Sequence, residues 1–195
     1  MTTFRHSFSA GMILCFASLA WAADHKAENG YNRLKAELGA AMPTGAGIHV
    51  SQVEADFNGP EAGLLYFPNP QDPAFSSKNF NDVTGQGGIS DHASFVGWYY
   101  YGTSLSFAPG IIHIDSYEAD HWLGAGQVRV MGAHPPRPEA RQIQNHSWIG
   151  EYAQGPNDPV SANALRRLDL LVDRDILSES LNLYNIRRVT PDSMQ

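Results

Sequence analysis

The stretch Ser90–Tyr101, SDHASFVGWYYY, read together with Gly45–Glu54, GAGIHVSQVE, decides the fold and the candidate site. The first stretch predicts a helix that its opening Ser or Asp caps, that carries His92 in its first turn, and that Gly102 ends. The second predicts a short β-branched strand that follows glycines and finishes on Glu54. A carboxylate at a strand end and a histidine at a helix start supply two of the three groups of a nucleophilic site.

The rest of the chain alternates strands and helices around these two stretches. The run Ile48–Val53 is short, β-branched and mixed in polarity, which suits a parallel strand that is covered on both sides. Periodicity predicts further strands over 111–117 and 143–149, and helices over 27–38, 118–123 and 159–176. This order predicts an α/β fold with three layers, a mainly parallel sheet with helices on both faces. Two segments show no period: 57–89, read as a long loop, and 177–195, read as an irregular tail.

Composition narrows the class of protein. The 195 residues carry a net charge of −7 with only three lysines, which argues against a nucleic-acid-binding surface. The only cysteine is Cys15. If the segment that holds Cys15 is removed, the mature chain has no thiol, and disulfides, thiolate catalysis and zinc–cysteine sites are excluded.

The N-terminus has the three parts of a secretory signal. A weakly basic region around Arg5 precedes the apolar run Met12–Trp21, and Ala20-Trp21-Ala22 forms an A-x-A cleavage site. The apolar run is short for a membrane span, although a retained N-terminal anchor is the alternative reading. We therefore expect residues 1–22 to be a signal peptide and the protein to be secreted or periplasmic, with no membrane attachment after cleavage.

Four short motifs stand in the order of a known family. A glycine-led strand ends on a carboxylate, a helix opens on H-A-S-F-V-G, an A-P-G turn follows it, and a later strand reads I-Q-N-H-S-W-I-G. The set resembles the subtilisin-like serine peptidases, whose catalytic residues run Asp, His, Ser along the chain. The motifs occupy residues 45–54, 92–97, 108–110 and 143–150.

The resemblance implies roles for particular residues. It makes His92 the general base and Glu54 the carboxylate that orients it, with Asp56 as the alternative orienting group if the strand end bends. It implies a peptide or protein substrate in contact with Asn145, Ser147 and Asp115. We expect no cofactor and no metal among these site residues, and calcium binding elsewhere stays open.

Departures from the family pattern limit the expected activity. Glu54 stands where the family has Asp, and the serine motif G-T-S-M-A is absent. Ser193-Met194 echoes that motif, but Pro191-Asp192 precede it. Helical spacing predicts an N-terminal helical segment over 23–44, and the resemblance predicts a partial peptidase domain over 45–176, incomplete or inactive because it lacks the nucleophile. A non-catalytic peptide-binding domain, or a degenerate one, stays open as the alternative.

Two further patterns have a simpler reading. His113, Asp115, Glu118 and His121 offer nitrogen and oxygen ligands at short spacing, but no established metal motif is present. We interpret them as ordinary hydrogen-bonded polar residues. The glycosylation sequon Asn145-His146-Ser147 lies on a predicted buried strand, which argues against modification.

Overall fold

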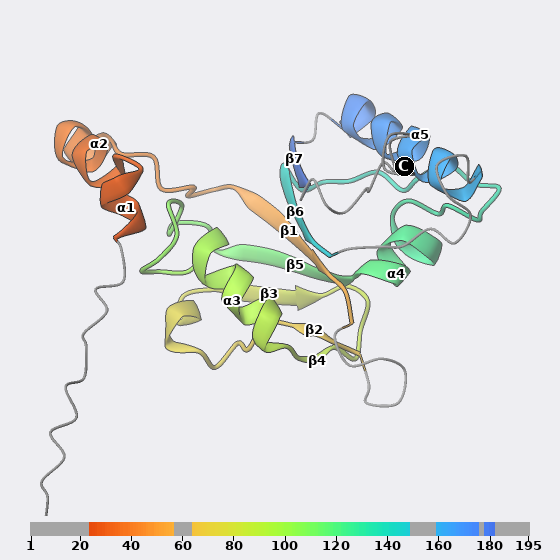
Figure 1. The fold of residues 1–195 in the computed structure, drawn as a ribbon, viewed down its shortest axis with the longest axis horizontal. Coiled ribbons are helices and arrows are strands. Elements are labelled where there is room, and N and C mark those ends of the chain that lie inside the picture. Colours follow the sequence, from red (N-terminus) through yellow and green to blue (C-terminus); the bar gives the residue numbers. More distant parts are fainter. Residues whose placement is uncertain (1–23, 57–63, 149–158, 176–177, 182–195) are drawn as a thin grey trace, which may run out of the picture.

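The chain folds around a five-stranded parallel sheet flanked by helices, an α/β architecture with three layers (Figure 1). The computed structural model describes residues 24–56, 64–148, 159–175 and 178–181. The strand order across the sheet is β3-β5-β1-β6-β7. These strands are β1 (His49–Glu54), β3 (Asn79–Asp82), β5 (His113–Glu118), β6 (Ile143–Ser147) and β7 (Ser178–Leu181). The predicted fold class is confirmed.

The two strands at the centre are the most buried. Every residue of β1 and of β5 after the first is buried, because both strands have a neighbour on each side and cover on both faces. Their pairing sets Glu54 opposite Glu118, while β6 sets Ser147 beside Glu54 on the other side. Glu54 therefore ends the central strand between two paired neighbours.

Each face of the sheet has its own apolar core. Helix α3 (Asp91–Tyr100) lies on the face of Val50, where it packs with Phe75, Tyr101 and Ile114. Helix α5 (Pro159–Asp175) lies on the face of Val53, in a cluster that also holds Tyr117, Trp122, Trp148, Leu168 and Leu171. Alternate residues of a strand point to opposite faces, so the two helices lie on opposite sides of the sheet.

The connections of α3 and α5 differ in handedness. Both β3-α3-β5 and β6-α5-β7 join neighbouring parallel strands and step across the sheet in the same direction. Because their helices lie on opposite faces, one of the two has the left-handed connection, which is rare in parallel sheets. Helix α3 therefore lies over the face that contains Glu54.

The predicted loop over 57–89 was wrong in part. It contains β2 (Leu65–Phe67), the 3₁₀ turn η2 (Pro73–Phe75), β3 and β4 (Gly88–Ile89), with β2 and β4 forming a separate two-stranded sheet. Strand β3 reads NFND and buries none of its residues fully. Its pairing with the edge of β5, not its own pattern, makes it a strand.

Both ends of the described chain also differ from the prediction. The helix expected over 27–38 is two helices, α1 (His25–Glu28) and α2 (Tyr31–Leu38), because Gly30 adopts a φ of +74° between them. The turn η1 (Gly39–Ala41) follows α2. The segment predicted as an irregular tail begins with β7, which pairs with β6.

The short helix predicted over 118–123 is also modified. It begins as α4 (Ala119–His121) and continues as a π-helical turn, η3 (Trp122–Gly126). The predicted signal peptide lies outside the described residues. Within the part of the chain that the structure describes, no helix has the length and apolar character to cross a bilayer.

Candidate functional site

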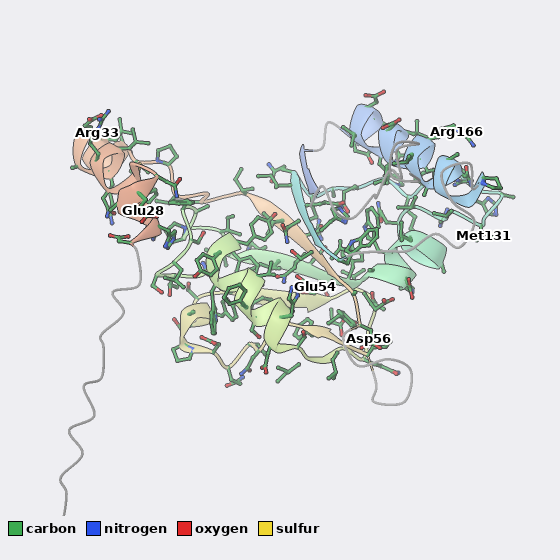
Figure 2. All side chains as sticks on the ribbon, in the orientation of Figure 1. Glu28, Arg33, Glu54, Asp56, Met131 and Arg166 are labelled. Carbon is green, nitrogen blue, oxygen red and sulfur yellow. The ribbon has the colours of Figure 1, made fainter. Side chains whose placement is uncertain are left out.

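The structure brings Glu54 and His92 together. The Nδ1 atom of His92 lies 2.8 Å from Oε2 of Glu54, across 38 positions of sequence. Glu54 is the last residue of β1 and His92 the second residue of α3. Figure 2 labels Glu54 at this end of the central strand.

Local sequence explains why the start of α3 lies against β1. The side-chain oxygen of Ser90 caps the helix by accepting from the backbone N–H of Ala93. The buried face of the helix consists of Ala93, Ser94 and Gly97, three small residues that let its backbone approach the sheet. The predicted helix start and close packing are both observed.

Gly97 offers a direct test of that close packing. A Cβ atom at this position would lie 2.5 Å from the Tyr101 hydroxyl oxygen and 2.9 Å from a ring atom of Phe75, two buried side chains. Alanine in a helix gains about 1 kcal/mol over glycine, but overpacking costs about 1–3 kcal/mol. We expect Gly97→Ala to lower the free energy of unfolding in urea, whereas Gly124→Ala, in the helical turn η3 where a Cβ meets nothing within 4 Å, should be at least as stable as the parent. Equal stability of the two variants would contradict the packing.

The carboxylate of Glu54 is buried and takes part in two hydrogen bonds. Only 1% of the residue is exposed, and Oε1 accepts a 2.7 Å hydrogen bond from the side-chain amide of Gln52. Burial raises the pKa of Glu54, and the hydrogen bonds from His92 and Gln52 oppose that rise. An ionised carboxylate only accepts hydrogen bonds, so Nδ1 of His92 carries a proton and the basic lone pair is on Nε2.

His92 is accessible where Glu54 is not. Its side chain is 45% exposed, so solvent or a ligand reaches one side of the ring while the other contacts the carboxylate. The hydrogen bond to Glu54 raises the pKa of His92, and partial desolvation opposes the rise. A partly exposed imidazole with a buried carboxylate partner has the arrangement of a general base.

Asn145 and Ser147 lie on the same face as this pair. The register places Asn145 beside Gln52 and Ser147 beside Glu54, and paired residues of neighbouring strands share a face. Both side chains are half-buried, and the Asn145 amide donates a 2.8 Å hydrogen bond to Ser147 Oγ. The structure therefore puts these two predicted substrate residues next to the carboxylate.

The other two predicted residues are elsewhere. Asp115 pairs with Ser51, so it points to the face opposite the pair, where Arg141 forms an ion pair with it and Asn81 donates a hydrogen bond. A cavity of about 170 Å³ on that face is lined by the imidazoles of His49 and His113, and by Asn79, Phe80, Asn81, Ile114, Asp115 and Arg141. Asp56 lies beyond the end of β1, where its carboxylate accepts the backbone N–H of Leu65. Glu54, not Asp56, is the carboxylate that bonds to Nδ1 of His92.

The residues considered as metal ligands are not gathered into a site. His113 and Asp115 share a face as strand alternation requires, but Glu118 uses both carboxylate oxygens to cap α4, accepting from the N–H groups of Asp120 and His121. Among the described residues no group of three His, Cys, Asp or Glu side chains is arranged to hold a metal ion.

The structure does not place the candidate nucleophile. Ser193, the serine that echoes the family motif, lies outside the described residues.

Comparisons with known proteins found no relative. No protein-family model, curated protein or solved structure matches the chain. The resemblance to the subtilisin-like peptidases therefore stays a proposal.

Sequence reasoning missed two members of the site, Gln52 and Tyr101. Both are fully buried, and the Tyr101 hydroxyl donates a 2.6 Å hydrogen bond to Oε1 of Gln52. A signal was present, because a glutamine in a strand that is expected to be covered on both faces needs hydrogen-bond partners.

Proposed function

We propose that this chain carries the carboxylate–histidine part of a serine-peptidase site, and that the chemistry of this site is that of an exported, subtilisin-like serine endopeptidase. The observation that carries the proposal is the 2.8 Å contact between buried Glu54 and half-exposed His92. It is supported by the neighbouring Asn145 and Ser147, which the register sets along the strand beside the carboxylate.

The reaction assigns one task to each residue. Nε2 of His92 takes the proton of a serine hydroxyl as its oxygen attacks the peptide carbonyl carbon. Glu54 stabilises the imidazolium that forms, as the carboxylate does in a Ser-His-Asp triad. The imidazolium then returns the proton to the leaving amine as the C–N bond breaks, and a water, deprotonated by His92, hydrolyses the acyl-enzyme. We assign this role to no serine among the described residues.

Labelling with a fluorophosphonate tests this chemistry, because the probe phosphonylates a serine only when a base activates it. Labelling of the full-length folded protein that His92→Gln slows by about 100-fold or more, the smaller end of a general base's contribution, would support the peptidase chemistry and show that the chain supplies a serine. His25→Gln is the matched control. His25 lies in the N-terminal helical segment, where its ring hydrogen-bonds to the backbone carbonyl of Leu105 and not to Glu54. Mass spectrometry of the labelled peptide identifies the serine.

The alternative is a non-catalytic domain that binds peptides, favoured by the half-buried amide and hydroxyl of Asn145 and Ser147 on the same face. A folded sample that stays unlabelled would overturn the peptidase proposal. Peptide-induced NMR shifts at His92 in that same sample would favour the binding domain, and their absence a degenerate one.

A further inference from the structure

The amide of Gln52 makes three hydrogen bonds inside the protein. Its Nε2 donates to Glu54 Oε1 at 2.7 Å and to the backbone carbonyl of Ala93 at 2.9 Å. Its Oε1 accepts from the Tyr101 hydroxyl at 2.6 Å. One buried side chain thus joins the central strand, the first turn of α3 and the residue that follows α3.

Chemistry fixes the orientation of this amide. A carboxylate and a backbone carbonyl only accept hydrogen bonds, so the NH₂ group must face Glu54 and Ala93. The carbonyl oxygen then faces Tyr101, whose hydroxyl can donate because burial raises the pKa of Tyr101 well above its usual value. Reversing the amide would set its carbonyl oxygen against two groups that only accept, the Glu54 carboxylate and the Ala93 carbonyl, so the network has one satisfied arrangement.

The two oxygens of Glu54 have separate tasks in this network. Oε1 is bonded to Gln52, which leaves Oε2 for His92. Gln52 and Glu54 are two positions apart on one strand, so their side chains extend from the same face and meet side by side. A glutamate has one more rotatable bond than an aspartate, and the bond from Gln52 restricts that added freedom.

We propose that Gln52 is a positioning residue that holds the Glu54 carboxylate in the orientation that fixes His92 as its Nδ1–H tautomer. It acts through Glu54 and touches neither substrate nor reacting atoms. The inference explains how a glutamate serves where the resemblance implies an aspartate. Its catalytic meaning rests on the proposed function, but the hydrogen-bond network does not.

The experiment uses the full chain with ¹⁵N-labelled histidine, and imidazole nitrogen chemical shifts report the tautomer of His92. The parent should show predominantly the Nδ1–H form, with a pKa of His92 above the ordinary value. Gln52→Met keeps the side-chain length and removes the amide. We expect the ratio of Nδ1–H to Nε2–H tautomer to fall about tenfold, the effect of losing one hydrogen bond to a charged group, and the pKa of His92 to fall toward 6.5.

The matched control is Gln144→Met. Gln144 is equally buried on the neighbouring strand and donates a 2.6 Å hydrogen bond to the carboxylate of Glu139, but it pairs with Ser51 and so points to the opposite face. It should leave the His92 tautomer unchanged. Tyr101→Phe, which removes one hydroxyl and keeps the ring, should shift the ratio in the direction of Gln52→Met by a smaller factor.

Two results would overturn the inference: an unchanged tautomer ratio in folded Gln52→Met, or an equal shift in Gln144→Met, which would indicate general loosening. If Gln52→Met does not fold, an unchanged tautomer ratio in folded Tyr101→Phe would overturn the inference instead. The tautomer ratio does not depend on labelling. A protein that fails the fluorophosphonate test can still show the effect of Gln52→Met, and a protein that is labelled can lack that effect.

Discussion

Acidification should destabilise the fold by on the order of 5 kcal/mol through His146 alone. Burial lowers the pKa of this histidine from 6.5 to about 3, and that difference converts to a free energy of this size. The unfolded chain takes up the proton first as the pH falls. The stability contributed by neutral His146 is therefore complete above pH 6.5 and is lost progressively down to about pH 3. Domains are stable by only about 5–15 kcal/mol, so this one residue is enough to unfold a marginal protein.

The surroundings of His146 explain why the charged form is excluded. Nδ1 accepts a hydrogen bond from the indole N–H of Trp148, so Nε2 holds the proton and donates to Oε1 of Gln144, each at 3.2 Å. The edge of the ring meets the indole of Trp122 at a centroid distance of 4.5 Å. A second proton would have to go on Nδ1, where it would oppose the Trp148 N–H and place a charge in an apolar core.

Urea unfolding at about pH 7 and about pH 4.5 measures the effect, and His146 should account for about 3 kcal/mol between those two values. His146→Phe keeps a ring but cannot be protonated. It should be less stable than the parent near neutral pH, because Trp148 and Gln144 lose a partner, and should show a smaller pH dependence by that amount. An undiminished dependence in His146→Phe would contradict the assignment.

Sequence periodicity predicted the elements whose own residues decide their structure. The central strands β1 and β5 and the helix α5 are examples, because the spacing of apolar residues that identifies each one lies within the element itself. Strands β3 and β7 differ, because neither NFND nor SESL has a strong apolar pattern, and each is a strand through pairing with its neighbour. Pairing between segments distant in sequence leaves no local trace.

In the candidate site, too, the features that depend on local sequence were predicted and those that depend on strand register or on distant partners were not. The resemblance implied that Glu54 and His92 meet, and they do, because a strand end and a helix start have definite positions in a parallel α/β sheet. Asp115 was expected at the same cleft, but register, which sequence does not reveal, puts it on the other face. Gln52 was not singled out, since its value depends on three partners, Glu54, Ala93 and Tyr101, that only the folded chain assembles.

Trp122→Ala should cost about 3–5 kcal/mol of unfolding free energy, the range for removing a large buried aromatic side chain. Trp122 is fully buried and packs in the same cluster as Val53 and Leu171, so the residual cavity lies between the sheet and α5. Trp122→Phe should cost much less. Among the described residues its indole N–H has no hydrogen-bond partner, and phenylalanine removes that unsatisfied donor while keeping a ring.

Urea unfolding of both variants checks the stability, and the imidazole nitrogen shifts of His92 check how far the damage extends. The cavity in Trp122→Ala opens on the face of Val53, and Glu54 points to the other face of the same strand. If the central strand keeps its pairing on both sides, the His92 tautomer stays that of the parent although the protein is several kcal/mol less stable. Equal losses for Ala and Phe would contradict the packing assignment. A changed tautomer in folded Trp122→Ala would show that the two cores are not independent, and that the position of the carboxylate depends on both faces of the sheet.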